Sequence, residues 1–303
     1  MCESINSISV LGCGLMGSTI ARKLVSSGVK TIGWNRTPVA AQKLEEHGVR
    51  PEISLEKAIS ASNCIFVVVS NYDVCKALFY PLLPLLAGKI VVNLTSGTCE
   101  SANEFGGKLR EEGVEYLDGS IWAMPGGIGT ADACIALSGS IVAWQSVQKC
   151  LESLGGASQY VGAEIGTANV LEAAFPGTFY MTAILSFLEG IALCKAYGIS
   201  EANIEQAIKP TLSLVRDGLA TCVEKIKARD FLTDQATQQV HYEAAISYTL
   251  NTRSPVKNSP LTSALLQTLE QSCKSGRSHE DIASTVCQWV TQSPARPSNL
   301  QDT

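Results

Sequence analysis

A glycine-rich hexapeptide placed directly after the first apolar run restricts the fold of this chain more than any other feature. The run 7–11 (Ser-Ile-Ser-Val-Leu) leads into Gly12-Cys13-Gly14-Leu15-Met16-Gly17. In a GxGxxG turn between a strand and a helix, the first glycine permits the turn and the second lets the backbone approach a pyrophosphate. The third packs the helix on the strand, and the helix N-terminus attracts the anion. We therefore predict a dinucleotide-binding site that comprises Gly12, Gly14, Leu15, Met16 and Gly17. The alternative is a turn with a structural role only.

The segment around this motif alternates β-rich runs with helix-like stretches, which is typical of a parallel sheet covered by crossover helices. The run 65–69 (Ile-Phe-Val-Val-Val) is apolar throughout, which indicates a strand buried on both faces. Strands are predicted at 7–11, 30–34, 64–69, 89–93, 116–121 and 134–138. We therefore expect an α/β fold whose residues 1–165 form a doubly wound Rossmann domain.

The β-rich runs disappear after Gly166. One long interdomain helix is predicted over 166–198, with Gly198 closing its C-terminal end. An all-helical C-terminal domain is expected over 199–291, with helices at 201–208, 212–228, 236–251, 260–275 and 280–290. The last residues, 292–303, include two prolines and few apolar side chains, so they are predicted to form a disordered tail.

The predicted interdomain helix is apolar almost all round and would be about 45 Å long. Its longest uncharged stretch, 173–188, spans 16 residues between Glu172 and Glu189, fewer than the roughly 20 that cross a bilayer. A helix without a polar face must be buried by something, and only about 100 residues follow it. We therefore expect a homodimer through the C-terminal domain and no membrane association.

Charge and cysteine usage exclude several classes of protein. The chain has 28 acidic and 23 basic residues and a net charge of −5, which argues against nucleic-acid binding. Its eleven cysteines occur singly, with no CxxC pair, so no metal site is predicted. Reduced cysteines within apolar runs, and an N-terminus without a basic and then apolar pattern, favour a cytoplasmic location.

The residues after the second predicted strand indicate which dinucleotide binds. At this position, roughly 20 residues beyond the glycine motif, NAD-binding chains place a carboxylate on the ribose hydroxyls. This chain has Asn35-Arg36-Thr37 instead. An arginine between two short hydrogen-bonding side chains suits a 2′-phosphate, so NADPH is predicted rather than NADH. The alternative is that Arg36 is only a solvated surface charge.

Further polar side chains follow later strands, at the sheet edge where ligands of open α/β sheets bind. Val69, Ser70 and Asn71 follow one strand, and Asn93 ends the next. All four are predicted to bind the cofactor, and Ser70 and Asn93 are predicted to bond the nicotinamide ribose or to hold the loop over it. For Asn93, a structural role at the strand end is the alternative.

These motifs resemble those of the superfamily of β-hydroxyacid dehydrogenases and 6-phosphogluconate dehydrogenase, and within it most closely the imine reductases and reductive aminases. The matching segments are 8–17, 33–37, 92–98 (Val-Asn-Leu-Thr-Ser-Gly-Thr) and 117–125 (Leu-Asp-Gly-Ser-Ile-Trp-Ala-Met-Pro), continuing to 129. The resemblance implies an NADP-dependent oxidoreductase with a Rossmann domain, a long interdomain helix and helical domains exchanged between two subunits.

One position separates the branches of this superfamily. In the β-hydroxyacid dehydrogenases, a lysine six residues after a key glycine works on the substrate hydroxyl; the corresponding residue here is Glu172, six after Gly166. Imine reductases commonly have an acidic residue or tyrosine there, and reductive aminases have a tyrosine two turns later, where this chain has Tyr180. The resemblance therefore implies Glu172 and Tyr180 as catalytic residues. The alternatives are that Glu172 is only a carboxylate favoured at the start of the helix and that Tyr180 is only an aromatic residue of the core.

The charge of Glu172 favours the same reaction. Hydride transfer to a carbonyl develops negative charge and calls for a cation, whereas reduction of an iminium neutralises a positive charge. A carboxylate would stabilise the iminium, or share its proton if burial raises its pKa. Eight residues of regular helix would separate Glu172 from Tyr180 by about 80° and ~12 Å. They could act on one nitrogen only if the helix bends between them. Pro176 cannot donate to the Glu172 carbonyl and clashes with it, so we expect a kink at Pro176-Gly177.

Trp122, Met124 and His241 are predicted to line the substrate pocket. The resemblance implies that His241 reaches it from the other subunit, and a structural histidine is the alternative. The expected function is NADPH-dependent reduction of a C=N bond in a small-molecule imine, with reductive amination of a carbonyl by an amine as an extension, in secondary metabolism. The alternatives are a β-hydroxyacid dehydrogenase or carbonyl reductase without the lysine, and a noncatalytic NADPH-binding sensor.

Overall fold

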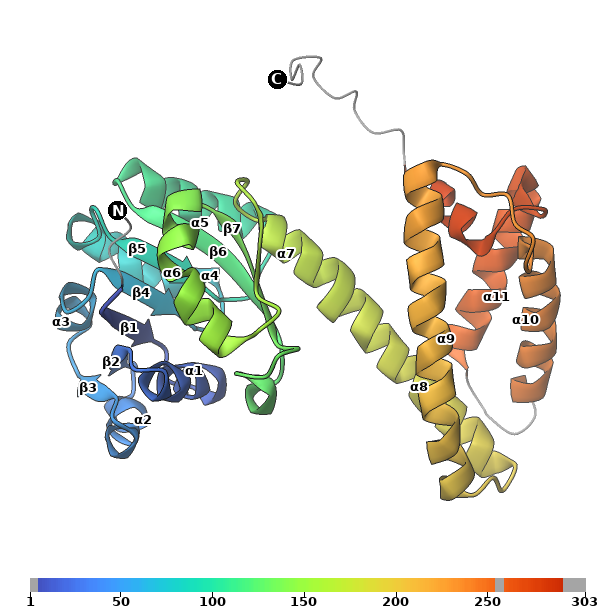
Figure 1. Cartoon of the computed structure of the whole chain (residues 1–303), viewed down its shortest axis with the longest axis horizontal. Coiled ribbons are helices and arrows are strands. Elements are labelled where there is room, and N and C mark those ends of the chain that lie inside the picture. Colours follow the sequence, from blue (N-terminus) through green and yellow to red (C-terminus); the bar gives the residue numbers. More distant parts are fainter. Residues whose placement is uncertain (1–4, 254–258, 291–303) are drawn as a thin grey trace, which may run out of the picture. The chain divides into compact units, whose positions relative to one another are not determined.

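The computed structural model describes residues 5–253 and 259–290. The chain divides into two compact units, the first ending at Tyr180 and the second beginning at Met181 (Figure 1). This division falls inside the helix predicted over 166–198, and the domain boundaries predicted on either side of that helix stay predictions. The tail predicted over 292–303 lies outside the described residues.

A single eight-stranded sheet forms the centre of the first unit, in the order β3-β2-β1-β4-β5-β6-β7-β8. Neighbouring strands run parallel except β6 and β7, which are antiparallel. The order reverses between β1 and β4, so the prediction of a doubly wound Rossmann sheet is confirmed. The strands are β1 (Ser7–Leu11), β2 (Lys30–Trp34), β3 (Arg50–Glu52), β4 (Cys64–Val67), β5 (Ile90–Asn93), β6 (Glu115–Trp122), β7 (Cys134–Gly139) and β8 (Gln159–Gly162).

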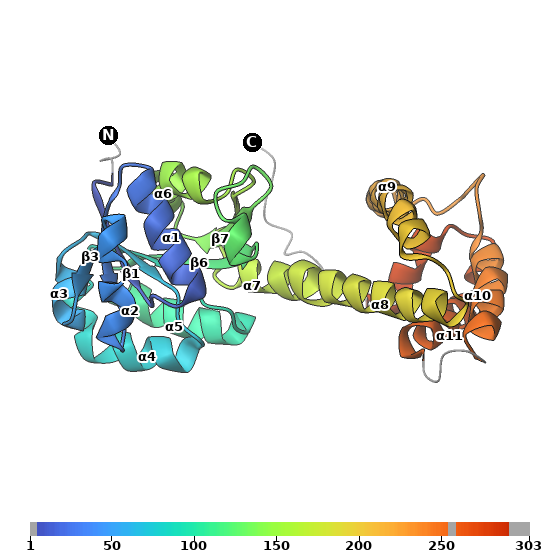
Figure 2. The same cartoon turned by 90° about the horizontal axis from the view of Figure 1, so that it is seen from below.

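Helices cover both faces of this sheet (Figure 2). One face carries α1 (Leu15–Ser26), α2 (Pro38–Gln42) and α6 (Ile141–Leu154), and the other carries α3 (Leu55–Ser60), α4 (Tyr72–Phe79) and α5 (Cys99–Glu111). Successive side chains of a strand point to opposite faces. In β4, Phe66 therefore enters one apolar core while Ile65 and Val67 enter the other, which explains why this run is apolar throughout.

Two strands were not expected from the sequence, and both lie at the edges of the sheet. β3 has three residues and includes Pro51, and β8 has four. An edge strand needs hydrogen bonds on one side only and tolerates proline. Neither strand therefore carries the apolar pattern that identified the others. Short turns of helix, η1 (Glu45–His47), η2 (Tyr80–Leu85) and η3 (Pro125–Gly127), complete this unit.

The segment predicted as one helix over 166–198 is helical from Thr167 to Ala196. It consists of α7 (Thr167–Glu172), a π-helical stretch η4 (Ala173–Phe179) and α8 (Tyr180–Ala196). Pro176 has no N–H for the Glu172 carbonyl four residues earlier, and the Tyr180 N–H bonds the Phe175 carbonyl, five residues earlier. The helix accommodates the proline by a wider turn, and the kink expected at Pro176-Gly177 stays a prediction.

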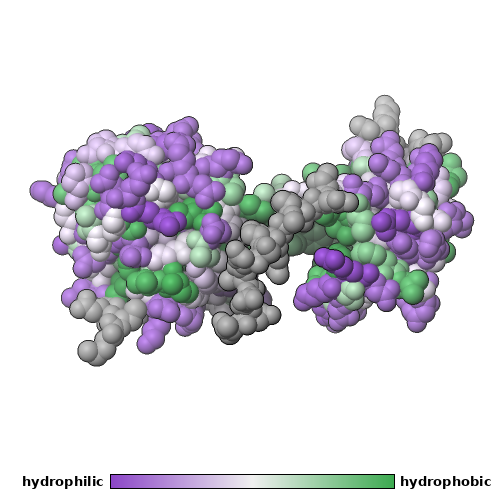
Figure 3. Space-filling view, turned by 90° about the horizontal axis from the view of Figure 1, so that it is seen from above, coloured by the Kyte–Doolittle hydropathy of each residue, from purple (hydrophilic) through white to green (hydrophobic). Residues whose placement is uncertain are grey.

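The helix Thr167–Ala196 is also long and apolar enough, by length and composition, to cross a membrane, with a mean hydropathy of 1.5. Within the described part of the chain, none of its most apolar window is buried. Figure 3 shows apolar side chains gathered along this part of the molecule. One such helix is weak evidence for a membrane span, because core helices of soluble proteins pass the same test. An apolar helix surface of this kind is unfavourable in water unless other protein or lipid buries it.

The described residues of the second unit form helices joined by loops, as expected. Its helices after α8 are α9 (Glu201–Ala228), α10 (Gln238–Arg253) and α11 (Pro260–Ser272), followed by the turns η5 (Cys273–Arg277) and η6 (Ile282–Gln288). Two separate helices were expected on either side of Pro210, but α9 continues through it. Pro210 is exposed, so water can bond the Gln206 carbonyl that the proline leaves without a donor.

Candidate functional site

The glycine motif after β1 has the geometry that dinucleotide binding requires. A Cβ at Gly12 would lie 2.1 Å from the Val68 carbonyl oxygen, and its φ is +104°, so only glycine fits there. A Cβ at Gly17 would lie 1.8 Å from the Gly12 carbonyl oxygen, because α1 packs directly on the turn. At Gly14, which caps α1, the space within 4 Å is open. That space faces the free N–H groups of the helix start, where a pyrophosphate would bind.

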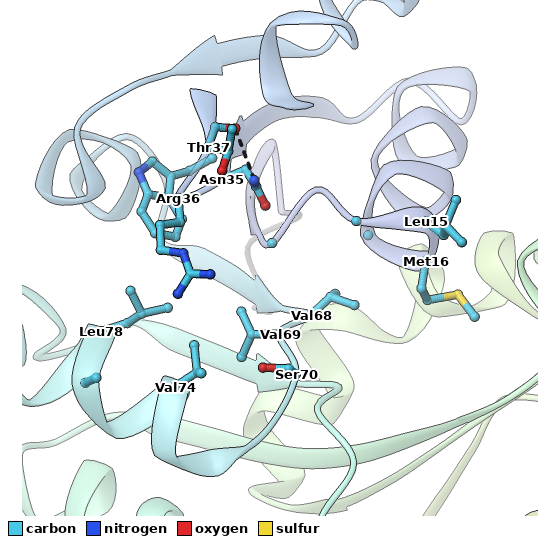
Figure 4. Close-up of a pocket in the computed structure, with 15 residues that line it drawn as sticks. Leu15, Met16, Asn35, Arg36, Thr37, Val68, Val69, Ser70, Val74 and Leu78 are labelled. Carbon is cyan, nitrogen blue, oxygen red and sulfur yellow. Dashed lines mark hydrogen bonds between the residues drawn. The ribbon is translucent and has the colours of Figure 1, made fainter. Parts of the chain in front are cut away.

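A cleft of about 580 Å³ opens from this turn along the carboxyl ends of β1, β2 and β4. Figure 4 shows the side chains that surround it. Ten of the predicted cofactor residues line it: Gly12, Gly14, Leu15, Met16, Gly17, Asn35, Arg36, Thr37, Val69 and Ser70. The sequence reasoning missed Trp34, Val68 and the α4 residues Val74, Ala77 and Leu78. The only available signal for the last three was their position in the helix that follows β4.

The two polar residues at the end of β2 have different tasks. Asn35 is held in place: its Oδ1 accepts from the Cys13 N–H at 3.0 Å, and its Nδ2 donates to the Thr37 carbonyl at 3.1 Å. It thereby fixes the glycine turn against the loop after β2. Arg36 is exposed and has no hydrogen bond or ion pair to any described residue, and its guanidinium lies over the cleft toward Leu78 (Figure 4). A free cation in this position suits an additional phosphate.

Asn71 and Asn93 lie outside the lining of the cleft. The Asn71 Oδ1 accepts from the Val74 N–H at 3.0 Å and caps α4. Asn93 is fully buried; its Oδ1 accepts from the Thr95 N–H at 3.3 Å and its Nδ2 donates to the Tyr116 hydroxyl at 3.1 Å. Both side chains hold loops that border the site, and their direct contact with a cofactor stays a prediction.

Glu172 lies at the end of α7, beside the loop after β5. Its Oε1 accepts a hydrogen bond from the Ser96 hydroxyl at 2.8 Å, and its side chain is half-buried. Burial raises the pKa of Glu172 above its usual range, and the Ser96 hydrogen bond partly offsets this. Gly166, with φ +87°, allows α7 to start here, because a Cβ would meet the Sγ of Cys99 at 2.8 Å. Ser96 was not singled out by the sequence reasoning.

A buried polar network lies beneath the same loop, and the sequence analysis did not anticipate it. Asp118 of β6 is fully buried and stands opposite Asn93 in the sheet. Its Oδ1 accepts from the Tyr72 hydroxyl at 2.5 Å and from the Tyr116 hydroxyl at 2.8 Å. Burial raises the pKa of Asp118 to about 7, against the effect of both tyrosines, and the charge of Glu172 adds to the rise.

Tyr180 is 45% exposed in the single chain. A residue added within a wider helical turn reduces the rotation between Glu172 and Tyr180 from about 80° to about 20°. The π-helical stretch between them therefore brings the two side chains toward one face of the helix. Their joint action on a substrate stays a prediction.

The three residues predicted to line the substrate pocket differ in their contacts and exposure. The Trp122 indole N–H donates to the Ser120 hydroxyl at 2.7 Å, which fixes the ring near the end of β6. Met124 is 67% exposed. His241 lies on α10 in the second unit and is partly exposed. The assignment of these three residues to a substrate pocket stays a prediction.

Metal binding finds no support in the described ranges 5–253 and 259–290, which contain no group of three or more His, Cys, Asp and Glu residues able to hold an ion. The site instead consists of a glycine turn, a cleft with a free arginine, and a carboxyl at the neighbouring sheet edge.

The fold and the cleft define a dinucleotide-binding protein of the Rossmann class. Comparison with protein-family models agrees: residues 7–162 match the NAD binding domain of 6-phosphogluconate dehydrogenase. The chain therefore belongs to the family defined by the NAD binding domain of 6-phosphogluconate dehydrogenase. The prediction of a dinucleotide-binding domain is therefore confirmed.

Similarity to individual proteins extends over nearly the whole chain. A curated NADPH-dependent reductive aminase from Aspergillus oryzae (strain ATCC 42149 / RIB 40) is 26% identical over 283 residues, covering 92% of this chain and 95% of that protein. Among solved structures, the imine reductase from Myxococcus stipitatus in complex with NADP⁺ is 27% identical with a TM-score of 0.86, covering 94% of this chain and 100% of that one.

An imine reductase from Pseudomonas sp. is 28% identical with a TM-score of 0.85, covering 95% of this chain and 100% of that one. The resemblance to imine reductases and reductive aminases that the sequence motifs indicated is thus confirmed.

Proposed function

We propose that this protein is an NADPH-dependent oxidoreductase that reduces the C=N bond of a small-molecule imine. The observation that carries the proposal is the half-buried Glu172 carboxyl on the Ser96 hydroxyl, at the position where alcohol-oxidising members of the superfamily have a lysine. The similarity over the whole length to imine reductases and a reductive aminase supports it.

The residues around the cleft fit NADPH. Gly14 leaves space for the pyrophosphate at the start of α1, and Arg36 supplies a cation without a competing protein partner among the described residues. When bound, NADPH would supply the hydride that is transferred to the imine carbon. Ser70 and Val69 border the end of the cleft at β4 and would hold the nicotinamide half.

Glu172 would act on the nitrogen of the substrate. An iminium loses its positive charge as it accepts a hydride, so an anion beside the nitrogen favours the protonated imine that is ready to react. Tyr180 would orient that nitrogen from the same side of the helix. Trp122 and Met124 would contribute apolar surface that excludes water and protects the imine from hydrolysis, and His241 of the partner subunit would complete the pocket.

The assembly we propose is a homodimer with exchanged C-terminal domains. Large apolar side chains on α8, such as Phe187 and Leu188, and on α9, such as Leu212 and Leu214, are exposed in the single chain. Surfaces of this extent in a water-soluble chain are typical of a subunit interface. A cytoplasmic location and a role in secondary metabolism belong to the same proposal.

The test is an assay of NADPH oxidation with two substrate panels. One panel contains cyclic imines. The other contains aldehydes in a buffer free of ammonia, so that no imine can form from them. Oxidation of 3-hydroxy acids with NADP⁺ completes the comparison. We expect turnover of imines, and a loss of roughly 100-fold or more in Glu172→Ala. Turnover restricted to carbonyls or hydroxy acids would support the dehydrogenase alternative. NADPH binding without turnover of any of them would support the sensor alternative.

A further inference from the structure

Asp118 is a second carboxyl near Glu172 for which the proposed reaction has so far no use. It is fully buried on β6. The titratable groups that face it are Tyr72 and Cys75 of α4, Tyr116 of its own strand, and Glu172 of α7. None of these groups is a cation, so no positive charge compensates an ionised Asp118.

The hydrogen bonds around Asp118 form two matching chains. The Asn93 Nδ2 donates to the Tyr116 hydroxyl at 3.1 Å, and the Asn169 Nδ2 lies 3.4 Å from the Tyr72 hydroxyl as its donor. Each tyrosine then donates its own O–H to the Oδ1 of Asp118. Burial and the neighbouring carboxyl raise the pKa of both tyrosines, so both hydroxyls stay protonated and remain donors.

The two oxygens of Asp118 are therefore unequal. Oδ1 receives both hydroxyls, whereas Oδ2 is buried without any hydrogen-bond partner among the described residues. An anion with one bare oxygen in a dry interior is costly, and a proton on that oxygen removes the charge. Glu172 is only half-buried and bonds the Ser96 hydroxyl. Of the two carboxyls, Glu172 is consequently the one that ionises first.

The same network holds the loop that carries Ser96. Asn169 donates to the Gly97 carbonyl at 3.1 Å, and Asn93 accepts from the Thr95 N–H. A Cβ at Gly97 would lie 2.4 Å from the Tyr72 ring. The loop is thus packed between the Asp118 network and Glu172, and the two carboxyls belong to one structural unit.

We propose that Asp118 and Glu172 form a carboxyl pair that holds one proton in the neutral range, with that proton on Asp118, so that Glu172 faces the substrate as an anion. Asp118 is then a positioning residue that acts through Glu172. The inference rests on the proposed function only for the identity of the group that Glu172 faces. It assigns Glu172 an electrostatic role rather than that of a proton donor.

Carboxyl ¹³C NMR on the wild-type protein, labelled at aspartate and glutamate, tests the pair directly. The two resonances are assigned by their loss in Asp118→Asn and Glu172→Gln. We expect Glu172 to lose its proton at a lower pH than Asp118. A Glu172 that titrates after Asp118, or an Asp118 that is ionised in acid, would overturn the proposal. This result does not depend on turnover, so it stands even if no imine is reduced.

Kinetics on Asp118→Asn give the second readout. The introduced amide is a neutral group that keeps one oxygen for both tyrosines, so it imitates the protonated carboxyl. At pH 6 we expect kcat/KM within about threefold of wild type, while Glu172→Gln loses roughly 100-fold. Above pH 8, wild type should exceed the variant, because the newly ionised Asp118 adds a second negative charge to the pair and strengthens the field that Glu172 presents to the iminium.

The ratio of wild type to variant cancels the protonation of the substrate itself. The control is Glu111→Gln, which removes one charge at the exposed end of α5, and its ratio to wild type should not change with pH. A ratio for Asp118→Asn that is flat across pH 6–9, or a loss at pH 6 equal to that of Glu172→Gln, would refute the assignment. Wild type inactive on every imine would instead refute the proposed function.

Discussion

Single side chains at the ends of the parallel strands determine what this fold can bind. Arg36 is the clearest case, since its guanidinium has no partner among the described residues and lies over the cleft. Asn35 beside it is already occupied by the glycine turn and its own loop. We therefore expect discrimination between NADPH and NADH to depend on Arg36.

Arg36→Ala should weaken NADPH binding by about 2 kcal/mol, or about thirtyfold, because a charge-assisted hydrogen bond to phosphate is lost. NADH binding should change by less than about threefold, since NADH has no 2′-phosphate. Fluorescence titration with both nucleotides measures this. Equal weakening of NADPH and NADH would show that Arg36 does not contact the phosphate.

Asp118 also makes a prediction about stability. Its pKa rises on folding from an ordinary value of 3.8 to about 7, so the folded state binds a proton that the unfolded state has released. The contribution of Asp118 to the unfolding free energy therefore falls as the pH rises between these values, by on the order of a few kcal/mol. Below that window the two states bind the proton equally.

Denaturant unfolding of wild type and Asp118→Asn at several pH values measures this difference. The variant should gain stability relative to wild type as the pH rises from about 4 to about 7, because only wild type must take up on folding a proton that its unfolded state has released. Subtracting the two curves removes the contributions of all other carboxyls. A difference that stays constant over this range would show that Asp118 does not titrate there.

At the scale of elements, the π-helical stretch Ala173–Phe179 is the feature that most affects the site. Pro176 prevents the regular bonding pattern, and the wider turn moves Tyr180 toward the face of Glu172. Pro176→Ala should restore a regular helix and rotate Tyr180 away, lowering kcat about tenfold. Tyr180→Phe should then add little to the loss.

The matched control is Pro210→Ala, which removes the interior proline of α9 and should leave kcat unchanged. A wild-type rate in Pro176→Ala, or losses from the two substitutions that multiply, would show that the wide turn does not position Tyr180. Steady-state kinetics on the single and double variants decide between these outcomes.

The elements themselves were largely predictable, for identifiable reasons. Most of the six predicted strands could be recognised because their runs are rich in apolar residues, and β4 is apolar throughout because it is buried on both faces. The edge strands β3 and β8 lack that signal. The glycine motif and Arg36 were found because local spacing defines them. The Asp118 network was not, since it depends on Tyr72, Asn93 and Asn169, which are distant in sequence and meet only in the folded sheet.

At the largest scale, exposed apolar side chains on the helices of the second unit are the basis of the proposed homodimer. No residue of α8 or α9 is buried in the single chain, yet many of their exposed side chains are large and apolar. Glu189, the acidic residue within α8, is used inside this unit: its carboxylate accepts from the Leu261 and Thr262 N–H groups and caps α11. The large apolar side chains around Glu189, such as Leu185 and Leu188, suit the second copy of the chain that the proposed homodimer supplies.

Sedimentation analysis should therefore give a dimer, and Leu188→Glu should shift it toward monomer by placing a charge in an apolar interface. Leu85→Glu makes the same change at an exposed leucine of the first unit and should leave the dimer intact. A monomeric wild-type chain, or one that partitions into lipid vesicles, would contradict the proposed assembly.

In the proposed reaction an anion at Glu172, and not a cation, serves the reacting group. The most direct test measures NADPH oxidation by wild type and Glu172→Lys on a cyclic imine and on the matching cyclic ketone. Wild type should reduce the imine, and Glu172→Lys should lose roughly 100-fold or more on it. Undiminished imine reduction by Glu172→Lys, or a wild-type preference for the ketone, would show that an anion at this position does not serve the reaction.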